Sequence, residues 1–492
     1  MTSQSEGSRP NFLIIMSDEH APMFSSAYGH ALVRTPNMDR LAKQGATFDA
    51  AYCNAPLCVP SRQSFMTGQF VSHCKGWDNA KPLPSDIMTW PYALRSMGYD
   101  AALSGKMHLI GPDKLHGFSK QLAYDPHGGS HEDAESARRL GLSSGGEHPI
   151  YLWQDGVPTA KEPWQSVHEA RAGTGPMIQA DDAIEAAALE YLKDPARREQ
   201  SFALCVGFVA PHFPFVVPEP YFSMYYPNNA DMPNNPPGHL DNLPAAAQRL
   251  RKAFGFYGYG DDEILRARSA YYGLITYLDD KIGRLLDALD EQGLADNTIV
   301  IHTSDHGESL GEHGLWRKMN FYEQSARVPL QVTWPGKIRG GQRFPGAVSL
   351  VDLTATILDM ADVPNEKRGL MDLDGESLLP LMREETTASK DEAFTEHLAH
   401  GTDRAQAMIR QANWKLCYSH GSLPDIELYD LETDPGEFEN LAGDPKHSDI
   451  QARLLARIME IWGDPDRMTR EIESGQGSRL LIRDVLGPEA LF

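Results

Sequence analysis

Three acidic side chains and one histidine stand directly after two strongly apolar runs of the sequence. Asp18 and Glu19 follow the first run, and Asp305 and His306 follow the second. Carboxylates that converge repel one another strongly unless a cation lies between them. The pattern therefore predicts a metal site; the alternative is that each group is a solvated turn residue.

A cysteine and an arginine mark a second reactive segment. Cys58 and Arg62 lie four residues apart, and Pro60 and Ser61 between them suit the start of a helix. Cys58 is then expected at a helix N-terminus, where backbone N–H groups favour an anion, and Arg62 can contact the same anion. The alternative is a buried cysteine beside a surface arginine.

Strands and helices must hold these residues in place. Residues 12–16 and 298–303 are continuous apolar runs, as expected for strands buried on both faces of a parallel sheet. A helix is predicted between Thr35, as its N-cap, and Gly45, and a longer amphipathic helix over residues 261–293. This order favours an α/β fold, in which ligands bind beyond the carboxyl ends of the strands.

Two stretches without clear periodicity, residues 124–178 and 227–260, are expected to be functional loops or disordered segments. After about residue 370 the pattern changes to short strands separated by polar turns. The predicted strands are residues 407–410, 414–418 and 427–431. They indicate a small antiparallel sheet and a second subdomain.

The composition limits the possible partners. The chain has 492 residues and a net charge of −23, which argues against nucleic acid or an anionic membrane as a partner. No apolar run approaches the length of a membrane span, and the polar start predicts no export signal. Five cysteines are an odd number, so a disulfide framework is not expected and a cytoplasmic location is the prediction.

The C-x-P-x-R pattern at Cys58 resembles the signature of the sulfatase family, within the alkaline phosphatase superfamily. Further segments resemble that family in the same order along the chain. They are residues 11–18, the G-K-x-H segment at 103–108, the Ala-Pro-His segment at 210–212, residues 303–307, residues 315–318 and the tail at 428–441.

This resemblance implies an alkaline phosphatase-like central sheet that is mixed, mostly parallel and flanked by helices. It also implies a smaller C-terminal α+β subdomain, built on the antiparallel sheet and ending in a helical tail. We assign residues 1–370 to the catalytic domain and 371–492 to the C-terminal subdomain.

In this family the cysteine is oxidised to formylglycine, whose hydrate attacks sulfur and forms a covalent sulfoenzyme intermediate. The resemblance implies that Asp18, Glu19, Asp305, His306 and the residue made from Cys58 hold one divalent metal. It further implies roles for Arg62, Lys106 and Lys318 in stabilising charge, for His212 (or Lys318) as proton donor, for His108 as base and for Asn79 in contacting substrate.

One departure is informative. Common arylsulfatases pair Asp-Asp with Asp-Asn, whereas this chain has Asp18-Glu19 and Asp305-His306. The Asp-His pair is more similar to choline sulfatases and phosphonate monoester hydrolases, which usually carry an amide in place of Glu19. An imidazole ligand makes manganese a rival to calcium, which prefers oxygen ligands.

The leading hypothesis is therefore metal-dependent hydrolysis of a small anionic sulfate ester. The open alternatives are a phosphonate monoester or phosphodiester hydrolase, a choline sulfatase, and an inactive metal-binding homologue with unmodified Cys58. The resemblance also implies a formylglycine-generating enzyme as maturation partner, and a homodimer or larger homo-oligomer. The net charge does not exclude an anionic substrate, because Arg62, Lys106 and Lys318 would surround it.

Overall fold

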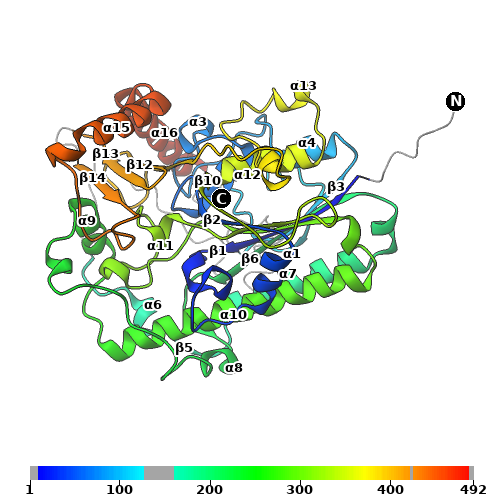
Figure 1. Ribbon diagram of the computed structural model, residues 1–492, viewed down its shortest axis with the longest axis horizontal. Helices are drawn as coiled ribbons and strands as arrows, with labels where there is room; N and C mark the ends of the chain where they lie inside the picture. The colour runs from blue at the N-terminus through cyan, green and yellow to red at the C-terminus, as the bar shows by residue number, and fades with distance from the viewer. Residues whose placement is uncertain (1–8, 127–159, 422–424, 487–492) are drawn as a thin grey trace.

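The computed structural model describes residues 9–126, 160–421 and 425–486. An eight-stranded mixed sheet lies at the centre of the molecule (Figure 1). Its strands, in spatial order, are β10 (Gln342–Ser349), β2 (Ala46–Tyr52), β9 (Leu330–Thr333), β8 (Thr298–Ser304), β1 (Asn11–Asp18), β6 (Phe202–Pro211), β3 (Asp100–Gly105) and β4 (Lys120–Ala123). Strands β8, β1, β6, β3 and β4 run parallel to one another, and β10 runs parallel to β2. Strand β9 runs antiparallel to both of its neighbours, β2 and β8. The predicted mixed, mostly parallel sheet is confirmed.

The apolar run of β1 is continuous because both of its faces are covered. Leu13 and Ile15 belong to one core, and Phe12, Ile14 and Met16 belong to the other. Successive strand residues point to opposite faces, so a strand buried on both sides needs apolar residues throughout.

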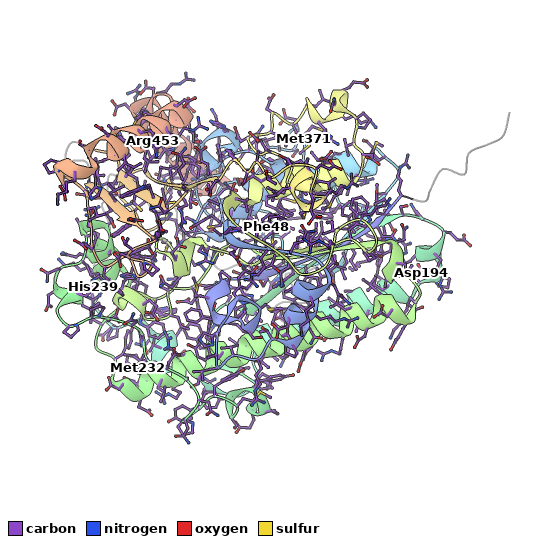
Figure 2. The ribbon with its side chains drawn as sticks, viewed as in Figure 1. Phe48, Asp194, Met232, His239, Met371 and Arg453 are labelled. Atoms are coloured by element: carbon purple, nitrogen blue, oxygen red, sulfur yellow. The ribbon has the colours of Figure 1, made fainter. Side chains whose placement is uncertain are left out.

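Helices form a layer on each face of the sheet (Figure 1). One layer contains α1 (Pro36–Gln44), α7 (Pro176–Lys193) and α10 (Asp261–Glu291). The other contains α2 (Cys58–Thr67), α4 (Trp90–Arg95) and α12 (Leu350–Met360). Phe48 of β2 is completely buried and lies near the middle of Figure 2, whereas Asp194 and Arg453 lie toward its edges.

The predicted helices at 36–44 and 261–293 are confirmed. The second one ends at Glu291, and Gly293 adopts a left-handed φ of 67° while Leu294 N–H donates to the carbonyl of Leu289. Thr35 is the N-cap residue of α1, as predicted, but its side chain does not bond to the first turn of the helix. The Thr35 hydroxyl bonds to Ser26 instead, and the carboxylate of Asp279 on α10 accepts the backbone N–H groups of Asn37 and Met38.

The expectation of a structureless stretch over residues 227–260 is also wrong in part. Helix α9 (Ala245–Phe254) lies there and buries Ala247, Leu250 and Ala253. Its apolar face consists mainly of small alanines, which gave little periodic signal. Of the other stretch, residues 127–159 lie outside the described part of the chain.

The C-terminal part contains four antiparallel strands rather than the three predicted. They are β11 (Glu392–His397), β12 (Gln406–Gln411), β13 (Trp414–Ser419) and β14 (Asp425–Asp430). Strand β11 escaped prediction because all six residues are buried although three are charged or imidazole side chains. The boundary at residue 370 stays a prediction; the antiparallel sheet itself begins at Glu392.

Helices α15 (Ser448–Trp462) and α16 (Pro465–Leu486) complete this end of the chain, at the upper left of Figure 1. Besides 3₁₀ turns, the remaining short helices and strands are α3 (Val71–Cys74), α6 (Gln165–His168), β5 (Arg171–Ala172), β7 (Val216–Val217), α8 (Glu219–Phe222), α11 (Glu323–Ala326), α13 (Asn365–Arg368) and α14 (Leu379–Met382). Among the helices described, none is both long and apolar enough to cross a membrane.

Candidate active site

Four neighbouring parallel strands deliver side chains to one edge of the sheet. Strands β8, β1, β6 and β3 lie side by side. Their register places Ser17 opposite Ser304, and Asp18 opposite Pro211. Asp305, Asp18, His212 and Lys106 stand at or directly after the ends of these strands. The parallel arrangement thus gathers residues that are far apart in the sequence.

A glycine lets the backbone after β3 cross close to β6. A Cβ at Gly207 would lie 1.9 Å from the carbonyl oxygen of Lys106, and Lys106 N–H donates to the carbonyl of Gly207 at 2.8 Å. Only a residue without a side chain permits this approach. Gly207 therefore positions Lys106.

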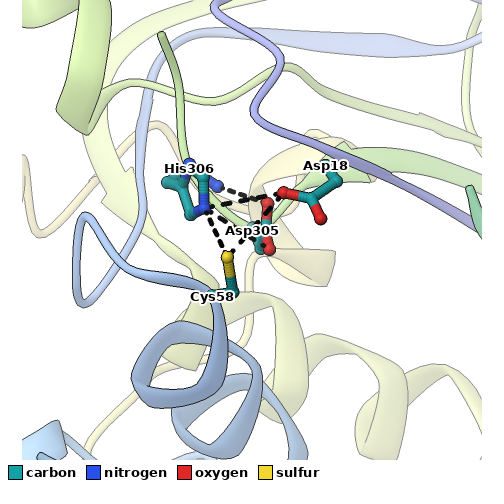
Figure 3. A group of neighbouring side chains, drawn as sticks. All are labelled: Asp18, Cys58, Asp305 and His306. Atoms are coloured by element: carbon teal, nitrogen blue, oxygen red, sulfur yellow. Dashed lines mark hydrogen bonds and ion pairs between the residues drawn. The ribbon is translucent and has the colours of Figure 1, made fainter. Parts of the chain in front are cut away.

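Cys58 reaches the site from α2, of which it is the first residue. Its Sγ lies 3.2 Å from His306 Nε2 and 4.0 Å from Asp18 Oδ1 (Figure 3). The hydroxyl of Ser61 donates to the carbonyl of Asp305 at 2.6 Å and so fixes the first turn of α2 to the end of β8. The predicted helix N-terminus at Cys58 is confirmed.

Asp18, Cys58, Asp305 and His306 form a group whose ligand atoms all lie within 4.8 Å of one another, and all four residues are buried. His306 Nδ1 lies 3.0 Å from the carbonyl of Gly307, so it carries the proton and leaves the Nε2 lone pair facing the group. Two carboxylates, an imidazole lone pair and sulfur suit a divalent cation. The residues present therefore fit a metal site.

Two cations hold the carboxylates of this group. Arg62 Nε donates to Asp305 Oδ2 at 2.8 Å, and Lys106 Nζ contacts Asp18 Oδ2. Burial alone would raise the pKa of Asp18, but Lys106, His212 and Arg62 outweigh it and hold that pKa well below its usual value. Asp18 is therefore ionised, as a metal ligand must be.

Glu19 is not brought into the group of four. Its Oε2 lies 3.0 Å from Lys318 Nζ and 3.1 Å from His212 Nε2, and Lys318 Nζ lies 2.9 Å from the same imidazole nitrogen. Glu19 and His212 form a second group of potential metal ligands with Asp18. Burial raises the pKa of Glu19 to about 8; Lys318 opposes this shift and Glu308 adds to it.

The thiol of Cys58 is a poor nucleophile in its unmodified form. Burial raises the pKa of Cys58 to about 11, an effect that Lys318 only partly offsets. A thiol with this pKa is protonated near neutral pH, and the thiolate is the reactive species. The buried environment therefore keeps the unmodified Cys58 thiol in its less reactive form.

His108 and Asn79 lie on loops that are fixed to the same region. The carboxylate of Asp125 accepts the backbone N–H of His108 at 2.6 Å, and His108 is 2% exposed. Asn79 Oδ1 accepts the N–H of Val59 at 3.1 Å, directly beside Cys58. The structure places both residues, and their chemical roles stay predictions.

Sequence reasoning missed three residues that hold the site together. Asp125 anchors residues 107 and 108, Tyr271 donates to the carbonyl of Glu19 at 2.7 Å, and Glu308 accepts the N–H groups of Leu310 and Arg317. Glu308 could have been noticed, because it follows the Asp305-His306-Gly307 segment. Asp125 and Tyr271 gave no local signal, since their partners are distant in sequence.

Comparison with known families agrees with this geometry. The sulfatase family model matches residues 10–363, and the model for the N-sulphoglucosamine sulphohydrolase C-terminal region matches residues 311–463. The chain belongs to the sulfatase family, within the alkaline phosphatase superfamily.

The individual proteins that this chain resembles are hydrolases. The chain is 34% identical to a choline-sulfatase of Rhizobium meliloti over 98% of its own length and 93% of that protein, and 29% identical to an arylsulfatase of Clostridium perfringens over 92% and 95%. The solved phosphonate monoester hydrolase of Agrobacterium radiobacter superposes with a TM-score of 0.72 at 25% identity. That superposition covers 92% of this chain and 95% of the other.

Proposed function

We propose that this chain hydrolyses sulfate monoesters, with Cys58 matured to formylglycine as the residue that attacks sulfur. The observation that carries the proposal is the position of Cys58 Sγ, 3.2 Å from His306 Nε2 within a buried group suited to a metal. An aldehyde hydrate at this position presents its oxygen where the sulfur now lies.

Asp18, Asp305 and His306 would hold a divalent ion, calcium or manganese, together with the residue made from Cys58. Such an ion supplies Lewis-acid stabilisation of the negative charge on the transferred group. Glu19 would join this set only if its carboxylate left Lys318 and His212.

Three buried cations counter the charge on the sulfuryl oxygens. The side chains of Arg62, Lys106 and Lys318 are each at most 3% exposed. Preorganised cations that are buried stabilise developing charge far better than they would in solution. They also explain how a chain of net charge −23 accepts an anionic ester.

The leaving alcohol needs a proton, and His212 with Lys318 can provide it. His212 Nδ1 lies against the carbonyl of Phe213 and therefore carries a proton, while its Nε2 accepts from Lys318 Nζ at 2.9 Å. His212 can thus donate from Nε2 once Lys318 has passed a proton to that nitrogen. Burial would lower the pKa of Lys318, but Cys58, Glu19 and Asp18 outweigh it and raise that pKa, which keeps a proton available. His212 is our proposed donor with Lys318 as the competing one, His108 is the proposed base, and Asn79 contacts a substrate oxygen.

Relative turnover of two model esters tests the reaction class. The proposal predicts a higher kcat/KM for an aryl sulfate than for the matching aryl phosphonate monoester. Faster phosphonate cleavage would instead favour the second candidate, a phosphonate monoester or phosphodiester hydrolase, which the similarity to the Agrobacterium radiobacter enzyme supports.

A choline ester is a further candidate for the substrate. Besides the 34% identical choline-sulfatase, it is supported by a cavity whose lining includes Met319, the residue that follows Lys318 in the sequence. Aromatic and acidic side chains of the kind that suit a quaternary ammonium line this cavity, together with Arg249. Those side chains are Tyr322, Tyr429, Glu427 and Glu437. Choline sulfate turned over faster than an aryl sulfate would support it, and the reverse order would count against it.

Maturation and assembly complete the proposal. Oxidation of Cys58 calls for a formylglycine-generating enzyme as partner, and a homodimer or larger homo-oligomer is the expected assembly. If no ester is hydrolysed and Cys58 is an unmodified thiol, the inactive metal-binding homologue is the correct interpretation.

A further inference from the structure

The loop at residues 76–81 lies along the start of the helix that carries Cys58. Asn79 Oδ1 accepts the N–H of Val59 at 3.1 Å, and one turn further on Gln63 Nε2 donates to the carbonyl of Lys81 at 2.7 Å. Val59 N–H is one of the first N–H groups of α2, which lack a partner within the helix. The loop therefore completes the N-terminal turn next to Cys58.

Arg479, on the C-terminal helix α16, holds this loop from the other side. Its Nη1 and Nη2 donate to Oδ1 and Oδ2 of Asp78, the residue before Asn79, at 2.9 and 2.5 Å. The Asp78 Oδ1 atom also accepts the N–H of Ala80 at 2.9 Å. Because the pair is bidentate and the acceptor closes a turn around Asn79, it fixes both the place and the orientation of that residue.

The rest of α16 supports the same contact. Arg479 and Asp78 are only 5% and 3% exposed, and Gly475, one turn earlier on α16, packs against Trp77 so closely that a Cβ there would lie 3.0 Å from the indole ring. Helix α16 therefore contacts two successive residues of the loop, Trp77 and Asp78. These contacts join segments 401 residues apart in the sequence.

Stability is a weak explanation for this ion pair. Removing two charges from water costs about as much as their attraction returns, so a buried pair is often no more stable than an apolar replacement. What such a pair does supply is a defined geometry. In this protein, the ion pair fixes the position of Asn79 against the first turn of α2.

We propose that Arg479 is a positioning residue for catalysis, acting through Asp78 to hold Asn79 against the helix that begins with Cys58. This inference rests on the proposed function, because it assigns Asn79 and Cys58 to the reacting site. On this proposal, the active site is incomplete until α16 has docked against the loop at residues 76–81.

The key variant is the double substitution Asp78→Asn with Arg479→Met. It removes both charges together, so no isolated charge stays buried, and the asparagine can still accept the N–H of Ala80. We expect a folded protein in which kcat/KM falls on the order of 10²-fold, the size of effect that a 1 Å misplacement produces. Arg470→Gln is the matched control, since this exposed arginine of α16 only approaches Asp464 at 4.0 Å.

Two readouts separate positioning from a purely structural role. If Arg479 acts through Asn79, adding Asn79→Ala to the double variant should lower kcat/KM by a further factor of less than about 2. If the two residues act independently, the losses in kcat/KM should multiply. Hydrogen exchange of the Val59 amide should become about 3- to 10-fold faster, the equivalent of one lost hydrogen bond. Mass spectrometry of Cys58 in each variant ensures that maturation is equal.

Multiplicative losses, or a Val59 amide that exchanges at the wild-type rate in the double variant, would overturn the proposal. The exchange measurement needs no substrate. If the wild-type protein hydrolysed neither sulfate nor phosphonate esters, the proposed function would fail while amide exchange still decided whether Arg479 holds the loop.

Discussion

Two clusters of buried charge in this molecule look similar in composition and differ in what they can do. The catalytic cluster, named for its proposed role, comprises Asp18, Glu19, Cys58, Arg62, Lys106, Asp305, His306 and Lys318. The interface cluster, where the four-stranded antiparallel sheet meets the central sheet, comprises Tyr52, Glu323, Arg410, Lys415 and Glu437. Tyr52 and Lys415 are completely buried, like Asp18 and Arg62.

In the interface cluster the charged side chains pair with one another, although burial still raises the pKa of Glu437 to about 7. Lys415 Nζ lies 3.0 Å from Glu323 and 2.6 Å from Glu437, and the Tyr52 hydroxyl donates to Glu323 at 2.9 Å. Burial would raise the pKa of Glu323, yet Lys415 and Arg327 outweigh it and lower that pKa. Within the described residues, this cluster brings no three metal-ligand atoms together.

In the catalytic cluster the cations occupy only part of the carboxylate oxygens. Asp18 Oδ1, His306 Nε2 and Cys58 Sγ still face one another, and in the described parts of the chain only the two overlapping groups at Asp18 bring three such ligands together. The comparison teaches that burial and charge density do not define a site. A site is defined instead by lone pairs that converge on one point beside a side chain that can be modified.

The largest expected effect comes from removing the sulfur of Cys58. Cys58→Ala should lower kcat by at least about 10⁴-fold, because the attacking group is lost, while leaving the fold intact. Turnover of an aryl sulfate together with the melting temperature checks this. Activity within about 10-fold of wild type would remove Cys58 from the mechanism.

Metal removal comes next in size. Treatment with a chelator should lower turnover by about 10³-fold, because several kcal/mol of charge stabilisation disappear, and either calcium or manganese should restore it. Metal analysis of wild type and His306→Ala provides the comparison, and we expect the variant to bind less metal. Full activity in metal-free protein would contradict the metal assignment.

The interface cluster should respond in stability rather than in activity. Lys415→Met leaves Glu323 and Glu437 buried without their cation, at a cost of about 3–5 kcal/mol. Denaturant unfolding measures this cost, and kcat of the folded variant should stay within about 3-fold of wild type. A stable variant with kcat lowered as strongly as by metal removal would erase the contrast between the two clusters.

The smallest effect concerns an ion pair outside both clusters. A hydrogen bond to Asp374 raises the pKa of His73 to about 9, above an unfolded value of about 6.5. The folded-state pKa is the higher one, so the stabilisation is complete below about pH 6.5 and is lost as pH rises through about 9.

His73→Gln should therefore lower the melting temperature most at mildly acid pH and least at alkaline pH. The pair is partly exposed, so the difference should stay below about 1 kcal/mol. Melting curves of both proteins across this pH range provide the measurement. A gap that widens with rising pH would show that the sign is wrong.

Local patterns predicted the elements that deliver the site. Strands β1 and β8 are continuous apolar runs ending in acid, and the helix start at Cys58 follows from the proline and serine two and three residues later. These features depend on neighbours in sequence, which the residue types reveal. The mixed sheet was inferred from the family resemblance rather than from the pattern of strands.

Long-range contacts were not predictable in the same way. Asp279 caps a helix 242 residues away, Arg479 binds Asp78 across 401 residues, and Glu19 bonds to Lys318 instead of joining the group of four. Each contact depends on how distant elements pack, which no local pattern contains. Strand β11 and helix α9 were missed because burial on both faces and small side chains removed the expected alternation.

Mass spectrometry of the peptide that contains Cys58, from protein matured in cells, tests the central claim most directly. The account predicts an aldehyde or its hydrate at this position, in a fraction that rises and falls with the specific activity toward sulfate esters. Fully active enzyme with an unmodified thiol at Cys58 would contradict it.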